Sequence, residues 1–222
     1  VLGTAAFTAC SDDDDNDNGG GSDNSEGIIT LMSEAEEFNI GDYYDSDNFW
    51  ISTPNGGDVI TIDWGDGITE EYASVAYQEE GETYYRVVPK HSYEDNKYSH
   101  SVTIKGNILR FYSFNDRITS LNVSKCPQLI YLFCVDSDLT NLDVTKNTLL
   151  EYLILELNEL ISLDISKCPA LKELVCDNNE FTAEEMNKIY NALPVVESGT
   201  LACDELGDWS IAEKKGWTVE LY

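Results

Sequence analysis

The chain has 222 residues, and its 42 acidic and 13 basic side chains give a net charge of −29. This length favours two domains over one. The charge excludes nucleic acid and anionic membrane surfaces as partners, because both would repel the chain. No apolar run approaches the ~20 residues that a membrane-spanning helix needs.

The first segment is apolar and ends in a cysteine. Residues 1–10 (VLGTAAFTAC) precede Ser11 and a run of aspartates. This pattern resembles the end of a lipoprotein signal peptide, with Cys10 as the lipid-bearing first residue of the mature chain. The resemblance implies that a charged stretch precedes Val1. The Ser-Asp run also resembles the signal that exports some Gram-negative lipoproteins to the cell surface, or it is only an acidic tether.

Residues 11–26 (SDDDDNDNGGGSDNSE) cannot bury apolar surface, so they predict a flexible acidic linker. Asp14 and Asn16 match the first positions of an EF-hand calcium loop. Ser25, however, stands where that loop needs a bidentate glutamate, and no metal site is predicted.

Residues 27–106 predict a separate small β domain, since short β-rich runs alternate with Gly- and Asn-rich turns. The runs are Ile28–Met32, Phe49–Ser52, Val59–Asp63, Tyr84–Val88 and Ser99–Ile104. The sequence from Asp63 to Gly67 (DWGDG) and the later His91-Ser92-Tyr93 resemble PKD-like immunoglobulin-type sandwiches. That resemblance implies a core position for Trp64, a tight turn at the glycines and a structural role for Asp63 and Asp66.

Residues 118–180 consist of three consecutive units of 21 residues each. Each unit follows the leucine-rich-repeat pattern L-x-x-L-x-[LC]-x-x-N, although Ser137 replaces the asparagine in the first unit. The pattern predicts a solenoid of short parallel strands, with Leu and Cys inside and Asn158 and Asn179 bonding backbone groups at the turns. A degraded unit comes before these three; it contains Ile108, Phe111, Ser113, Asp116 and Ile118.

Residues 182–222 predict a cap over the open end of the stack. Thr182 and Glu185 form a capping box before a helix that Pro194 ends. A parallel strand over 200–204, a short helix over 208–215 and a last strand over 217–221 are expected to follow.

The expected fold class is therefore mainly β with some α. A small β-sandwich (27–106) precedes a short leucine-rich-repeat solenoid with a helical C-terminal cap (107–222). This order of segments resembles the BspA-like surface leucine-rich-repeat lipoproteins. The resemblance implies a lipoprotein displayed on the outer membrane that binds macromolecules of host or neighbouring cells, and it implies no reaction.

The cysteines and histidines predict no chemistry. Five cysteines remain besides Cys10, and an odd number argues against a disulfide framework. They are expected to be small core residues, with Cys176 and Cys203 the one pair that could be neighbours. The two histidines, His91 and His100, lie outside any zinc or catalytic pattern, so neither an enzyme nor a cofactor is predicted.

An apolar patch is predicted on the outer face of the repeat sheet, from the side chains that alternate with the buried leucines. Arg110 and Tyr112 lie at the start of two columns of such side chains. Aromatic residues and arginine often anchor partners. The expected ligand-binding residues are Tyr112, Phe114, Tyr131, Phe133, Val135, Tyr152 and Ile154.

Two functions fit this patch. In the first, the chain is an adhesion module whose patch binds a protein or glycan. In the second, it is a structural or accessory outer-membrane lipoprotein whose patch is covered by the β domain, by a second copy in a homodimer, or by a complex. A third, weaker interpretation is carbohydrate binding through Trp50 and Trp64.

Overall fold

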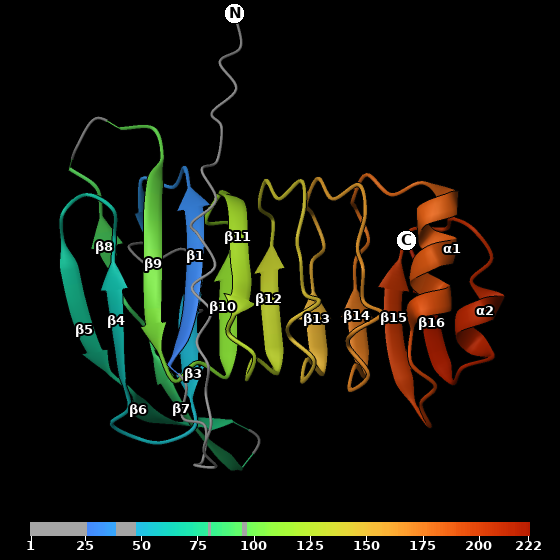
Figure 1. The fold of residues 1–222 in the computed structure, drawn as a ribbon, viewed down its shortest axis with the longest axis horizontal. Coiled ribbons are helices and arrows are strands. Elements are labelled where there is room, and N and C mark those ends of the chain that lie inside the picture. Colours follow the sequence, from blue (N-terminus) through green and yellow to red (C-terminus); the bar gives the residue numbers. More distant parts are fainter. Residues whose placement is uncertain (1–25, 39–47, 80, 95–96) are drawn as a thin grey trace, which may run out of the picture.

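The computed structural model describes residues 26–38, 48–79, 81–94 and 97–222 (Figure 1). The predicted lipid-bearing Cys10 and the linker up to residue 25 lie outside the described residues. The described chain is mainly β with some α, as the sequence predicts. Neither described helix has the length and apolar character that crossing a membrane requires.

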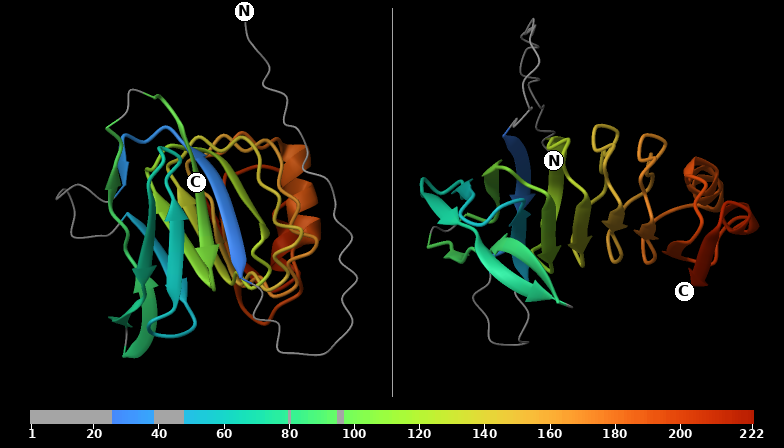
Figure 2. Two further views of the ribbon diagram at one scale, coloured as in Figure 1. Left: turned by 60° about the vertical axis from the view of Figure 1, so that its left-hand side comes forward. Right: turned by 90° about the horizontal axis from the view of Figure 1, so that it is seen from below.

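Two large sheets form two layers at the N-terminal end of the molecule, and one of them continues to the C-terminal end (Figures 1 and 2). The smaller sheet has five strands, in the order β11 (Ile118–Lys125), β1 (Gly27–Ser33), β9 (His100–Gly106), β4 (Val59–Asp63) and β5 (Thr69–Ala73). The larger has nine, in the order β16 (Trp217–Leu221), β15 (Gly199–Cys203), β14 (Glu173–Val175), β13 (Tyr152–Ile154), β12 (Tyr131–Val135), β10 (Arg110–Phe114), β3 (Phe49–Thr53), β7 (Glu82–Val87) and β6 (Val75–Glu79). A short pair, β2 (Glu37–Phe38) and β8 (His91–Ser92), stands apart.

Both large sheets cross the predicted domain boundary at residues 106 and 107. Strand β3 pairs antiparallel with β10, which places Trp50 opposite Tyr112. Strand β11 pairs antiparallel with β1, which places Leu121 opposite Leu31. The buried residues of both segments also belong to one core cluster. Residues 27–106 therefore share both large sheets and the core with the repeats, and among the described strands only the short pair β2 and β8 is made from this segment alone.

The 21-residue units stack through parallel strands in register, as predicted. Phe111, Leu132, Leu153, Leu174 and Leu201 follow one another across β10, β12, β13, β14 and β15. All five side chains are fully buried. Because side chains alternate along a strand, burial of this row turns the residues on either side of it to the outer face.

Asparagine side chains hold successive units together at the turns. Asn158 donates from Nδ2 to the carbonyls of Cys134 and Leu155, at 2.8 and 3.1 Å, and accepts from the Leu139 N–H at 3.2 Å. Asn179 repeats these contacts one unit later. The predicted role of these residues is confirmed, and the buried backbone groups that they satisfy would otherwise lack partners.

Each unit leaves the sheet through a residue in the left-handed backbone region. These residues lie 21 positions apart, with φ between 52° and 58°, and are Asn115, Asp136, Leu157 and Asn178. Asparagine and aspartate tolerate this conformation better than other non-glycine residues, so Leu157 is the one strained member of the set.

The first unit differs from the two that follow. Its residues 118–125 form β11, whereas the equivalent residues 139–146 and 160–167 form no strand. The difference follows from β1, whose edge offers backbone partners to the first unit alone. The sequence pattern, which is nearly the same in all three units, does not predict this strand.

The helices and strands predicted after the repeats are present. Helix α1 (Ala183–Ala192) begins after Thr182, whose hydroxyl accepts from the Glu185 N–H at 3.2 Å. The expected strands near 200–204 and 217–221 are β15 and β16, and the second helix, α2 (Ser210–Glu213), is shorter than expected. Tyr190 of α1 donates its hydroxyl to the Leu206 carbonyl at 2.7 Å, which ties the helix to the segment between β15 and α2.

The Asp-Trp-Gly-Asp-Gly segment has a structural role. Trp64 is fully buried and stacks on His91, with ring centroids 4.6 Å apart. Gly65 and Gly67 have positive φ, and Asp66 lies 2.9 Å from His91 Nε2. Although burial raises it, the pKa of Asp66 stays below its ordinary value because the Ile68 N–H and His91 bond the carboxylate. The predicted core position of Trp64 and the tight turn are confirmed.

All five cysteines in the described part of the chain are buried and free. Burial raises the pKa of Cys126 and Cys134 to about 12 and that of Cys168 to about 11. Such thiols stay protonated and are poor nucleophiles. The expectation of small core residues is confirmed, and Cys176 and Cys203 form no bridge.

Asp116 occupies the place that asparagine takes in the later units. Its carboxylate is buried and accepts from the Ser113 hydroxyl at 2.6 Å, while its carbonyl accepts from the Ser33 hydroxyl of β1 at 2.6 Å. Burial raises the pKa of Asp116 to about 7, against the hydrogen bond from Ser113, which lowers it. The residue therefore joins the two sheets at the cost of a carboxylate that resists ionisation.

Replacing Asn158 with alanine should lower the free energy of unfolding by about 2–4 kcal/mol, because several buried backbone groups lose their partners. Asn141→Ala is the matched control, since the Asn141 amide bonds only the Thr140 hydroxyl at the surface; it should cost no more than ~0.5 kcal/mol. Urea unfolding measures both. Equal effects would contradict a stabilising role for the turn asparagines.

Asp116→Asn should stabilise the protein at neutral and alkaline pH. The folded pKa of Asp116 lies above its ordinary value of 3.8, so folding binds a proton and the wild type gains stability as pH falls through about 7. Asparagine removes this dependence. The unfolding free energy of the variant should exceed that of the wild type by ~2–4 kcal/mol near pH 8, and the excess should shrink towards pH 5. A constant difference across that range would contradict a buried, protonatable Asp116.

Candidate binding surface

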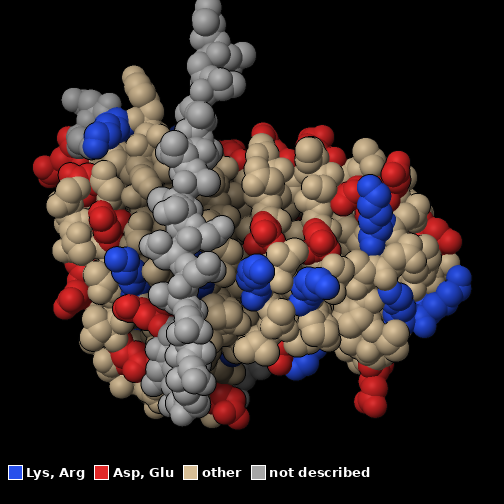
Figure 3. Space-filling model, in the orientation of Figure 1, with Lys and Arg blue, Asp and Glu red and all other residues tan. Residues whose placement is uncertain are grey.

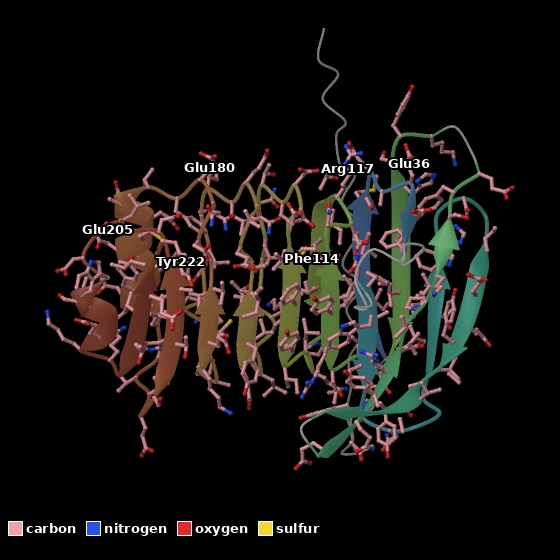
Figure 4. The ribbon with its side chains drawn as sticks, turned by 180° about the vertical axis from the view of Figure 1, so that it is seen from behind. Glu36, Phe114, Arg117, Glu180, Glu205 and Tyr222 are labelled. Atoms are coloured by element: carbon pink, nitrogen blue, oxygen red, sulfur yellow. The ribbon has the colours of Figure 1, made fainter. Side chains whose placement is uncertain are left out.

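The outer face of the nine-stranded sheet carries a row of aromatic rings. Trp50 of β3, Tyr112 of β10 and Phe133 of β12 lie in register on neighbouring strands. Their backbones alternate with the buried row that contains Phe111 and Leu132, so all three side chains point away from the core. Figure 4 views the molecule from this side, with Phe114 labelled. We call Trp50, Tyr112 and Phe133 the aromatic ladder.

The rings of the aromatic ladder stack face to face. The Trp50 and Tyr112 centroids are 5.0 Å apart with planes inclined by 10°, and those of Tyr112 and Phe133 are 4.1 Å apart with planes inclined by 14°. Parallel rings lying side by side in one plane would need ~6 Å or more between centroids, given carbon contacts of ~3.5–4.0 Å. The rings therefore stand upright on the sheet, cover each other's faces and turn their edges outward.

A second row runs beside the ladder and contains an arginine. The Tyr131 ring lies 6.4 Å from Phe133 and 5.9 Å from Tyr152, centroid to centroid. The guanidinium carbon of Arg110 lies 4.3 Å from the Tyr84 ring centroid and 5.8 Å from that of Tyr131. Arginine held near aromatic rings in this way gains cation–π attraction. We call the ladder together with Tyr84, Arg110, Tyr131 and Tyr152 the aromatic–arginine face.

Five of the seven predicted ligand-binding residues reach the surface. Tyr112, Tyr131, Phe133 and Tyr152 are half-buried, and Phe114 is 37% exposed. Val135 and Ile154 were expected to be exposed, but they are 0% and 8% exposed. Each has a short side chain, and its in-register neighbour on one side is a phenylalanine, Phe114 for Val135 and Phe133 for Ile154. These two residues therefore offer little or no contact area to a partner.

Trp50 and Tyr84 belong to this face although the sequence predicts them in a separate domain. Trp50 comes here because β3 pairs with β10, a pairing between distant segments that no local pattern signals. Tyr84 follows because β7 pairs with β3. Alternation within the β-rich runs around Trp50 and Tyr84 could have shown which side chains share a face, but not which strands are neighbours.

Charge divides the outer face into two halves. Three acidic residues lie beyond the aromatic–arginine face: Glu173 in β14, Glu156 just after β13 and the buried Asp177 just after β14. Burial, and next the charge of Asp177, raise the pKa of Glu156, whereas burial and the Asp116 carboxylate raise that of Tyr112. The opposite side of the molecule shows acidic and basic side chains intermixed (Figure 3). An arginine among aromatic rings on one half of the outer face thus borders an acidic half.

Other side-chain groups offer weaker sites. A hollow of about 450 Å³ is lined by Glu34, Tyr93, Lys97, Arg117 and their neighbours. Arg117 and Glu34 form an ion pair there at 3.0 Å, so their charges are already satisfied. Within the described ranges, no group of three or more His, Cys, Asp or Glu side chains is placed to hold a metal ion.

Known proteins offer no guide to this surface. No family model, curated protein or solved structure gives a significant match to the chain. The function must therefore be inferred from the geometry of the outer face and from the sequence patterns that build it.

Replacing Trp50 with alanine should cost about 1–2 kcal/mol of unfolding free energy, the contribution of one stacked, half-buried ring. Trp64→Ala, which empties a fully buried position, should cost ~3–5 kcal/mol. Urea unfolding followed by far-UV circular dichroism compares the two. A Trp50 variant as destabilised as the Trp64 variant would show that Trp50 belongs to the core and not to the outer face.

Proposed function

We propose that this chain is a surface-exposed binding module that holds a macromolecule on the outer face of its nine-stranded sheet. In this proposal residues 107–222 form a short leucine-rich-repeat solenoid with a C-terminal cap, and residues 27–106 contribute a PKD-like sandwich that covers its first strand. The 21-residue period, the in-register parallel strands and the asparagine contacts at the turns support this fold.

The aromatic–arginine face is the observation that carries the proposal. Tyrosine, tryptophan and arginine dominate the binding energy of known interfaces, and here they gather on one open sheet face. Burial of their rings against a partner would remove apolar area from water at roughly 25 cal/mol per Å². The register of the strands fixes the ring positions before any partner arrives, which reduces the conformational entropy that binding must overcome.

A binding role fits better than a catalytic one. His91, which lies nearest to carboxylates, is buried, stacks on Trp64 and contacts Asp66. His100 stacks on Tyr93, with ring centroids 3.4 Å apart. Both histidines thus contribute to the packing of the N-terminal segment, away from the outer face, and we propose no reaction and no cofactor.

The cell location belongs to the same proposal and rests on the sequence. A lipid on Cys10 would tether the chain to the outer membrane, and the acidic residues after it would favour display at the surface. The partner would then be a protein or glycan of a host or neighbouring cell.

Phe133→Asp should weaken binding of the full chain to its partner by at least ~10-fold, because it places a charge in the aromatic ladder where rings must be desolvated. The measurement is surface plasmon resonance against a panel of immobilised matrix proteins and glycans. Ile161→Asp is the matched control, since Ile161 is 65% exposed and lies outside every strand; it should bind as the wild type does.

Light scattering on the same proteins tests the second function. A monomer whose binding requires Phe133 supports the binding module. A wild-type dimer that Phe133→Asp dissociates, with no panel member bound, would contradict the proposal and show that a second copy occupies the face. Equal loss in the Phe133 and Ile161 variants would also contradict it, because added charge alone would then explain the effect.

A further inference from the structure

Arg86 lies over the Tyr77 ring, 3.6 Å from its centroid, and Arg110 likewise lies near aromatic rings on the outer face. Arg110 is half-buried, and its guanidinium lies near the rings of Tyr84 and Tyr131. Those rings restrict the side chain, since a planar guanidinium gains attraction by remaining over an aromatic face. The position of its N–H donors is therefore set by the sheet.

No carboxylate among the described residues pairs with Arg110. By contrast, Arg117 pairs with Glu34 at 3.0 Å and Lys172 with Glu151 at 2.7 Å. The acid in the same row as Arg110 is Glu173, which follows Tyr131 and Tyr152 across the sheet. Three strand spacings of ~4.8 Å separate the two residues, or ~14 Å, which exceeds the screening length in physiological salt.

Within the described ranges, exposed lysines such as Lys125 and Lys146 also form no ion pair, but Arg110 is half-buried beside aromatic rings. A guanidinium presents a rigid fork of donors that matches a carboxylate in two parallel hydrogen bonds. Its removal from water on partner binding would be unfavourable unless an anion satisfied those donors. A partner that covers the aromatic–arginine face must therefore supply an acidic group at Arg110.

The aromatic ladder favours a protein over a glycan as that partner. Sugar rings bind by lying on open aromatic faces, but Trp50, Tyr112 and Phe133 cover each other's faces at 5.0 and 4.1 Å. Their outward edges form a ridged apolar surface that suits aliphatic and aromatic side chains. The acidic half of the face would repel a second carboxylate around Glu173, which limits the partner's acid to the Arg110 end.

From this geometry we infer that the aromatic–arginine face binds an acidic protein segment, with an Asp or Glu carboxylate on Arg110 and apolar side chains across the edges of the ladder. The inference rests on the proposed binding function and names its partner. The inferred partner is the opposite of what the net charge alone favours, because a chain with a net charge of −29 attracts basic peptides and repels acidic ones.

The inference is tested by selecting peptides from a random phage library with the full chain as the target. Peptides of about 12 residues are suitable because they span up to ~40 Å when extended. Wild type should enrich peptides that contain Asp or Glu beside apolar residues. Arg110→Gln should not enrich them. The selected peptides should bind Arg110→Gln at least ~10-fold more weakly than wild type, and Arg117→Gln within about twofold of it.

A double-mutant cycle makes the contact specific. Changing the peptide's acid to its amide should weaken binding to the wild type by the same factor as Arg110→Gln does. The same change in the peptide should weaken binding to the Arg110→Gln variant little further. Unchanged urea midpoints of Arg110→Gln and Arg110→Lys exclude a folding defect as the cause. Arg110→Lys keeps the positive charge but loses the forked pair of guanidinium donors. Its affinity for the peptide should lie between those of the wild type and Arg110→Gln.

The outcomes separate this inference from the proposed function. Selected peptides that lack acids, or that bind Arg110→Gln as well as wild type yet lose binding with Phe133→Asp, would overturn the inference and leave the binding face intact. Phe133-dependent binding of an oligogalacturonate with no peptide enriched would also overturn it, in favour of an acidic glycan. If the chain binds neither a peptide nor an oligosaccharide in a way that depends on Phe133, the inference and the proposed function are both overturned.

Discussion

The chain returns to the sheet after every 21 residues, one strand spacing further along and in the same register. The rest of the molecule depends on this constraint. It stacks the row from Phe111 to Leu174 inside, and because side chains alternate it stacks a second row outside. The strand spacing of ~4.8 Å is close to the separation at which aromatic rings pack face to face. Where Trp50, Tyr112 and Phe133 occupy one outer column, a ladder of stacked rings results, and the period sets its spacing.

The period also imposes demands at the turns, which the chain meets with polar side chains. Each unit passes through a left-handed residue, and in the last two units an asparagine then satisfies backbone groups of two units. The first position of this series is Asp116. Its carboxylate accepts from the Ser113 hydroxyl of β10, and its backbone carbonyl accepts from the Ser33 hydroxyl of β1. The junction of the two sheets is thus built from the same position that elsewhere joins one repeat to the next.

The sequence predicts the repetitive part of the fold well and the pairing between distant strands poorly. Leucine spacing locates β12, β13 and β14, and the capping box at Thr182 locates α1, because both are local signals. The pairing of Trp50 with Tyr112 depends on which edge of the stack remained open, which no local pattern encodes. For the same reason the columns correctly place Tyr112 and Phe133 on the outer face but miss Trp50 and Tyr84. Burial of Val135 and Ile154 depends on the relative heights of neighbouring side chains, which alternation alone does not describe.

The aromatic–arginine face lies at the beginning of the stack, on β7, β3, β10, β12 and β13, whereas α1, α2 and β16 lie at the other end. Units of 21 residues could therefore be added or lost between β14 and the cap while every ring and the guanidinium kept their neighbours. The length of such a molecule, and hence how far its C-terminal end projects, can change in evolution independently of the residues that form the aromatic–arginine face. Duplication of a later unit would lengthen the molecule, whereas duplication of the first units would also change the aromatic–arginine face.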